Sequence, residues 1–234
     1  MPVPDRLDEP VPARRLLTDD VFDRLQDDIV RGRLAPGQRL YDLSLASELG
    51  LSRATVRTAL LRLKEVKLVE AVPNLYTRVA PLDLVRYLET QDTARALYLF
   101  AARMGTPFLT DEQISGFRAY GDDAAERVEV DADNLFSGRA EAAALLPFVD
   151  ALGNAALARA VQRLSPTIRR MTGLHADLIP CDGIFDTIRS LSAAAGRRDA
   201  EGVTAALNAY YDGPIAEFHE RLGDLFDETG PVHP

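Results

Sequence analysis

The sequence predicts a mainly α-helical protein in which the N-terminal third closes with a short two-stranded hairpin. Two observations support this fold class. Apolar residues recur at helical spacing through most of the chain, and strand-like runs bounded by turn residues occur only around residues 68–79. The length of 234 residues fits one large domain or two small ones.

Composition narrows the class of protein. Hydrophobic residues make up 47% and charged residues 27% of the chain, and no stretch approaches the ~20 apolar residues that a membrane span needs. The single cysteine, Cys181, cannot form an internal disulfide, and the N-terminus is acidic and proline-rich, unlike a secretion signal. We therefore expect a cytoplasmic protein without a membrane partner.

The common motifs of enzymes and metal sites are missing from the sequence. It contains no G-x-S-x-G, no P-loop and no G-x-G-x-x-G motif. The three histidines, His175, His219 and His233, lack ligand spacing, which excludes a zinc finger and a HExxH metalloprotease. We expect no enzyme activity, no catalytic residue and no cofactor.

Charge is unevenly distributed along the chain. The formal net charge is −9, but residues 1–80 carry 13 basic and 12 acidic side chains, so the excess acid lies entirely C-terminal. Residues 52–78 contain six basic and two acidic side chains. Such a basic segment suits DNA phosphates, although a solvated helix can carry the same charge.

Two helices are expected before residue 51. Val21, Leu25 and Ile29 recur at helical spacing and predict a helix over about 19–31, followed by a Pro36-Gly37 turn and a short extended segment at 39–41. Ser44 is the expected N-cap of a second, short helix that ends at Gly50.

A third helix is expected over 53–66, with Ser52 as its N-cap. Its buried stripe is predicted to consist of Val56, Ala59, Leu60 and Leu63. The rest of its surface is predicted to carry Arg53, Thr55, Arg57 and Arg62. Strands at 68–72 and 75–79 flank a Pro73-Asn74 turn. Three helices and such a hairpin make a winged helix-turn-helix, which we place at residues 16–80, after a flexible arm at 1–15.

In such a fold the third helix can enter the major groove of DNA with its N-terminal side chains facing base edges. Arg53 and Arg57 are four residues apart and share a face, and a guanidinium can bond guanine O6 and N7 together or clamp a phosphate. Thr55 is placed to touch a thymine methyl group. The periodicity alone also fits a three-helix bundle that mediates only protein contacts.

The run from Ile29 to Pro81 resembles the DNA-binding domain of GntR-type bacterial transcription regulators. It contains I-x-x-G-x-L-x-P-G-x-x-L from Ile29 to Leu40 and L-A-x-x-L-G-x-S-R-x-x-V-R from Leu45 to Arg57. The chain departs from the family at Lys67, where glycine is usual, and in the wing, which has apolar residues where basic ones are usual. The DNA-binding candidates are Arg39, Ser44, Ser52, Arg53, Thr55, Arg57 and Asn74.

The rest of the chain predicts only helices, the first over 84–104. Thr110 to Gln113 form a capping box that opens the next. Further helices are expected at about 132–152, 154–164, 166–176, 183–195 and 200–211, and after Pro214. Pro147 should kink or split its helix, and Asp212-Gly213-Pro214 should interrupt the last one. The layout is similar to the all-helical FCD effector domain of FadR-like GntR regulators, at 81–228, with a tail at 229–234.

Many FCD domains bind a divalent metal through an aspartate and three histidines. The corresponding positions here are Glu141, Leu145, Ile188 and Tyr210. Leu145 and Ile188 offer no lone pair, so a transition-metal site cannot be assembled from these four. We therefore expect no bound metal.

An effector would then be recognised by other groups. Arg95 points into the cavity of the resembling domains, and it is suited to a carboxylate or phosphate. Alternatively, Arg95 pairs with an acid such as Glu141, or side chains fill the cavity. The candidate effector-binding residues are Arg95, Tyr98, Glu141, Leu145, Asn154, Ile188 and Tyr210.

These expectations combine into a transcription regulator that binds a two-fold operator in double-stranded DNA as a homodimer. A small-molecule effector, anionic if Arg95 holds it, would change the relative placement of the DNA-binding domains through a hinge at 80–83. The alternative is a degenerate regulator that acts as a protein-interaction module without effector sensing.

Overall fold

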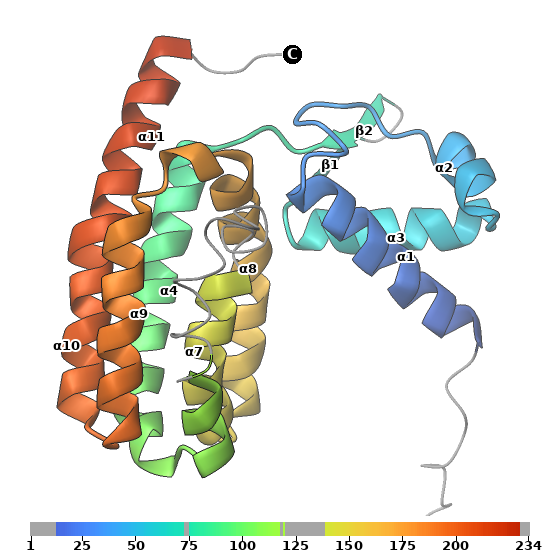
Figure 1. Ribbon diagram of the computed structural model, residues 1–234. Helices are drawn as coiled ribbons and strands as arrows, with labels where there is room; N and C mark the ends of the chain where they lie inside the picture. Colours follow the sequence, from blue (N-terminus) through green and yellow to red (C-terminus); the bar gives the residue numbers. More distant parts are fainter. Residues whose placement is uncertain (1–12, 73–74, 118, 120–138, 230–234) are drawn as a thin grey trace, which may run out of the picture. The chain divides into compact units, whose positions relative to one another are not determined.

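A computed structural model describes residues 13–72, 75–117, 119 and 139–229. The chain divides near Ala80 into an N-terminal unit and a C-terminal unit, each with its own core (Figure 1). The N-terminal unit contains three helices and a two-stranded sheet, and the described C-terminal unit contains only helices. This confirms the predicted fold class.

The N-terminal unit contains α1 (Ala13–Val30), α2 (Asp42–Leu49), α3 (Arg53–Glu65), β1 (Val69–Val72) and β2 (Tyr76–Val79). The strands pair antiparallel, with Val69 opposite Val79. The expected start of the first helix near residue 19 was wrong. It begins at Ala13, because residues 13–17 are alanine, arginine and leucine, which favour helix.

The expected apolar stripes pack together in the core of the N-terminal unit. Val21 and Ile29 of α1 and Val56 and Leu63 of α3 are each 3% exposed or less. The backbone amides of Lys67 and Leu68 donate to the carbonyls of Lys64 and Leu63, at 3.0 Å each, and so end α3. This is a Schellman motif, which needs a left-handed residue at the first position beyond the cap. Lys67 takes that conformation, with φ of 62°.

The C-terminal unit is a helical bundle in which α4 contacts four of the other helices: α7, α8, α10 and α11 (Figure 1). Its elements are α4 (Leu84–Gly105), η1 (Thr106–Phe108), α7 (Arg139–Ala151), α8 (Ala155–Leu174), η2 (Ala176–Leu178), α9 (Cys181–Gly196), α10 (Ala200–Tyr210), η3 (Tyr211–Ile215) and α11 (Ala216–Thr229). Across the described residues, none of the helices has the length and apolar character to cross a membrane.

Three prolines are accommodated without the breaks expected from the sequence. The predicted helices 154–164 and 166–176 are one helix, α8, because Pro166 is buried in its interior and the packing around it offsets the missing hydrogen bond. α7 also continues past Pro147, so of the two expected outcomes, a kink or a split, the split is wrong. Pro214 lies in η3, a π-helical turn that joins α10 to α11, so the expected interruption there is only a local widening. The capping box at Thr110 and Gln113 is confirmed by its two hydrogen bonds.

Candidate nucleic-acid interface

The N-terminus of α3 is held by the predicted cap. The hydroxyl of Ser52 accepts a hydrogen bond from the backbone amide of Thr55 at 3.2 Å and lies 2.8 Å from the Thr55 hydroxyl. Thr55 is only 6% exposed. Its expected surface position was therefore wrong, because its hydroxyl turns back to complete the cap. In this structure Thr55 supports the helix end, and its side chain is almost entirely buried.

Arg53 and Arg57 lie on the exposed face of α3, with side chains 56% and 65% exposed. Both bond the carboxylate of Asp42, at the start of α2. One guanidinium nitrogen of Arg53 lies 3.1 Å and 3.2 Å from its two oxygens, and a nitrogen of Arg57 lies 2.8 Å from Oδ2. Partial burial raises the pKa of Asp42, but the hydrogen bonds from Arg57 and Arg53 together lower it below its ordinary value.

Asp42 was not among the residues predicted from the sequence. It lies 11 and 15 residues before its two partners, which is beyond any helical spacing, so no local pattern links them. Only the packing of α2 against α3 brings the three side chains together. Exposed ion pairs contribute at most about 1 kcal/mol, so both arginines can exchange Asp42 for a phosphate or a base edge.

The remaining DNA-binding candidates lie in different settings. Ser44 is exposed in the first turn of α2 and is not its cap, because the helix already begins at Asp42 and Tyr41 occupies the cap position. Arg39 is exposed and pairs with Arg78 of β2 through a backbone bridge. Asn74 lies outside the described residues.

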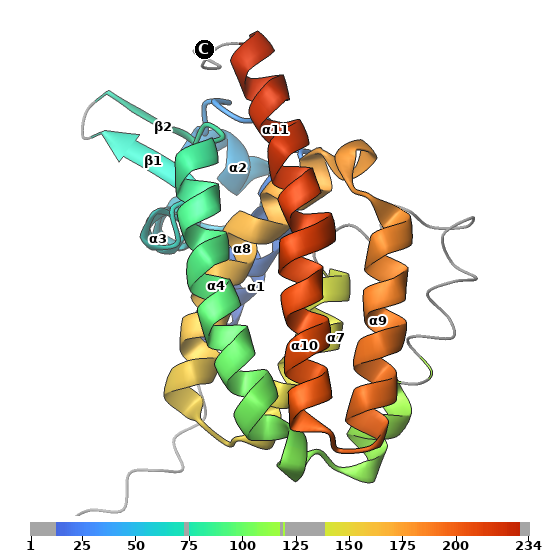
Figure 2. The same cartoon turned by 90° about the vertical axis from the view of Figure 1, so that its left-hand side faces the viewer.

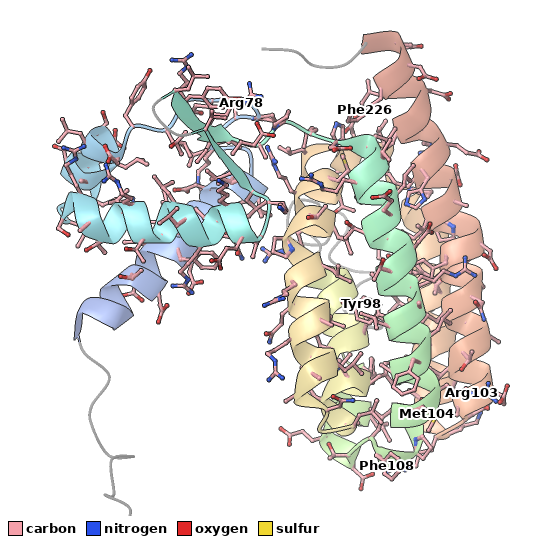
Figure 3. All side chains as sticks on the ribbon, turned by 180° about the vertical axis from the view of Figure 1, so that it is seen from behind. Arg78, Tyr98, Arg103, Met104, Phe108 and Phe226 are labelled. Carbon is pink, nitrogen blue, oxygen red and sulfur yellow. The ribbon has the colours of Figure 1, made fainter. Side chains whose placement is uncertain are left out.

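The wing and α3 border a hollow of about 590 Å³. Its basic side chains are Arg39, Arg57 and Lys64. Apolar side chains also line it and are unusually exposed, among them Val72 at 41%, Leu75 at 69% and Tyr41 at 60%. Arg78 (labelled in Figure 3) pairs with Glu70 across the wing at 2.9 Å. The described wing residues that line this hollow are thus mainly apolar, as the sequence indicated.

The described side chains of the effector-binding candidates lie in different settings. Tyr98 and Leu145 are packed in the core, and Asn154 caps α8 through its side chain. Ile188 is 8% exposed, and Tyr210 packs against the core. Arg95 does pair with an acid, but the described partner is Asp212, at 2.8 Å.

The side chain of Glu141 lies outside the described residues. Within the described part of the chain, no three His, Cys, Asp or Glu side chains are grouped as metal ligands would be. The absence of a metal from the C-terminal unit therefore stays a prediction, based on the residue types at the four positions.

Comparison with known proteins identifies the N-terminal unit. Residues 17–79 match the family model described as bacterial regulatory proteins, gntR family. An uncharacterized HTH-type transcriptional regulator, BphR of Paraburkholderia xenovorans, is 29% identical over 88% of this chain and 87% of its own length. An HTH-type regulator from an unstable DNA locus of Streptomyces ambofaciens is 31% identical over 34% of each chain.

Solved structures show the same fold. E. coli McbR/YncC aligns over 92% of this chain and 99% of its own, with a TM-score of 0.67 and 21% identity. A putative GntR regulator from Rhodococcus sp. RHA1 aligns over 86% of this chain and 96% of its own, with a TM-score of 0.69 and 20% identity. The family and the curated relatives are transcription regulators, not enzymes. The chain is therefore a DNA-binding transcription regulator with a helix-turn-helix domain of the GntR family at residues 17–79.

Proposed function

We propose that this regulator binds a two-fold operator as a cytoplasmic homodimer, with α3 in the major groove, and that a small molecule in the C-terminal unit controls it without a metal. The observation that carries the DNA-binding geometry is the exposed pair Arg53 and Arg57 at the start of α3. Asp42 holds both guanidiniums side by side, on the helix end that such a fold presents to base edges.

An apolar strip on the C-terminal unit supports the homodimer. Phe100 and Met104 on α4 and Phe108 in η1 are 51%, 48% and 64% exposed. Their spacing of four residues puts them on one side, and Figure 3 shows Met104 and Phe108 at the same end of the bundle. Clustered exposed aromatic and methionine side chains are typical of interface cores, and a second copy of the chain would cover them.

The first test is selection of bound fragments from the source genome, with the Arg53→Ala/Arg57→Ala protein in parallel and Arg189→Ala as the matched control. Arg189 is equally exposed but lies on α9. We expect an enriched palindromic site with wild type and Arg189→Ala, and a loss of about tenfold to a hundredfold in affinity for each arginine removed from α3. Binding should also weaken steeply as salt rises.

A second candidate function follows from the apolar wing. Val72 and Leu75 expose apolar surface where a DNA-contacting wing would carry charge, which favours a protein-interaction module. The protein-interaction module would be favoured if the selection enriched no site and the wild type and the double variant behaved alike. A nonpalindromic site would instead contradict the two-fold operator while leaving DNA binding intact.

A further inference from the structure

The C-terminal unit has a cavity of about 280 Å³ between α4 and the π-helical turn with α11. Figure 2 shows α4 beside the stretch that runs from α10 into α11. Gln91, Asp92 and Arg95 line the cavity from α4, and Tyr211, Asp212 and His219 line it from the other side. Its volume is near the lower limit of the ~300–1,000 Å³ found for small-molecule pockets. Of these residues only Arg95 was a sequence candidate for effector binding.

Two buried polar atoms in this lining have no hydrogen-bond partner in the described structure: Oε1 of Gln91 and Nε2 of His219. Gln91 is only 1% exposed, and its amide nitrogen donates to the Tyr87 hydroxyl at 3.0 Å. Leaving a buried polar atom unsatisfied destabilises the folded protein, because the atom loses its hydrogen bonds to water. Two such atoms at one cavity indicate a site at which a bound polar molecule completes the hydrogen bonding.

The charges around the cavity indicate which kind of molecule it can bind. The positive charge of Arg95 is already compensated, because its guanidinium bonds Asp212 at 2.8 Å and the side-chain oxygen of Asn208 at 3.1 Å. Asp92 makes no ion pair within the described residues. Burial lowers the pKa of His219, against the opposing effect of Asp92, so the imidazole adds no positive charge at neutral pH. The lining therefore keeps one uncompensated negative charge and an acceptor oxygen.

We propose that this cavity binds a small organic ammonium ion. Its three N–H groups donate to Oε1 of Gln91, to the carboxylate of Asp92 and to Nε2 of the neutral His219, and its hydrocarbon part lies against Ile215, which also lines the cavity. An anion would have to displace Asp212 from Arg95 and would meet Asp92 with the same charge. That such a ligand acts as the effector rests on the proposed function, whereas its binding does not.

The test compares three probes of equal size and different charge: butylammonium, butyrate and butanol. Each is titrated into the full chain while the backbone amide signals of α4 and α11 are followed by NMR. We expect saturable shifts with butylammonium only. Asp92→Asn should weaken butylammonium binding about threefold to fivefold, because the ligand loses one ion pair with an exposed carboxylate. Gln91→Met should also weaken binding while keeping the side-chain volume.

Glu89→Gln is the matched control, since Glu89 is an exposed acid on α4 that does not line the cavity. Unchanged affinity in Glu89→Gln, with native spectra for all variants, completes the expected result. Binding of butyrate or butanol in preference to butylammonium, equal affinity in Asp92→Asn and wild type, or no saturable shift with any probe would each overturn the proposal. If the protein binds its operator but not butylammonium, only the proposed ammonium site is refuted. If it binds butylammonium but no DNA, only the operator model is refuted.

Discussion

At the scale of single residues, Asp42 organises the surface of α3 that we propose faces DNA. One carboxylate accepts hydrogen bonds from two arginines of α3, so the guanidiniums lie close together in a defined arrangement despite their exposure. Holding them there reduces the side-chain entropy that would be lost on binding. Asp42 also repels phosphates, so DNA that cannot replace both of its hydrogen bonds is disfavoured.

Asp42→Ala should therefore lower specificity. We expect tighter binding to random DNA, because a negative charge is removed, and a ratio of operator to random-DNA affinity that falls about threefold to tenfold. Fluorescence anisotropy with both DNAs at one salt concentration measures the ratio. Glu48→Ala removes another acid of α2 that has no such contact with α3 and should leave the ratio unchanged. An equal drop in both variants would show that only net charge matters.

Lys67 illustrates backbone strain at one position. Its φ of 62° is the left-handed conformation required by the Schellman motif, in which a side chain costs about 1–2 kcal/mol relative to glycine. The chain thus keeps the geometry of the motif without the residue that suits it best.

Lys67→Gly should stabilise the N-terminal unit by about 1 kcal/mol, after part of the gain is offset by the greater freedom of glycine in the unfolded chain. Urea unfolding followed by circular dichroism measures the change. Lys67→Ala removes the charge but keeps the strained φ, so its stability should stay near wild type. Equal gains for glycine and alanine would assign the effect to the charge.

At the scale of elements, local signals predicted the helix ends well where a side chain bonds its own backbone. Ser52 and Thr110 were predicted correctly as N-caps, because each side chain bonds a backbone amide only three residues further along the chain. The prediction that Ser44 caps the second helix was wrong, since Asp42 can begin the helix equally well. The prediction that a new helix begins at Pro166 was wrong, because tertiary packing keeps this proline inside α8. A single sequence does not reveal such packing.

The two serines allow a direct comparison. Ser52→Ala should destabilise α3 by about 1 kcal/mol, because the Thr55 amide loses the Ser52 hydroxyl as an acceptor and keeps only the backbone carbonyl of residue 52. Ser44→Ala should change stability by less than about 0.5 kcal/mol, because the side chain is exposed and caps nothing. Hydrogen exchange of the amides in α2 and α3 measures both effects. A larger loss in Ser44→Ala would contradict the observed helix boundaries.

At the scale of the whole molecule, the sequence motifs identified the N-terminal unit more fully than the C-terminal unit. Arg53 and Arg57 became DNA-binding candidates because a short motif contains them. The lining of the C-terminal cavity comes from α4 and from residues more than a hundred positions later, so no spacing rule joins Gln91 to His219. The pairing of Arg95 with Asp212 was missed for the same reason.

The assembly can be tested on the strip of Phe100, Met104 and Phe108. Phe100→Asp/Met104→Asp should convert the proposed homodimer to a monomer, because two charges would have to be buried in an apolar contact. Sedimentation equilibrium gives the mass. Ser190→Asp, at an exposed position of α9, should stay dimeric. A dimeric double variant would place the interface on another surface.

The π-helical turn η3 also affects how this chain should be aligned with its relatives. A π-helical turn holds one residue more than an α-helical turn, and one residue corresponds to about 100° of rotation. Alignment with any relative that lacks the turn therefore needs a one-residue gap within 211–215. Without that gap, every position from Ala216 onward would be compared with a residue on a different face, and the counterpart of His219 would be misassigned.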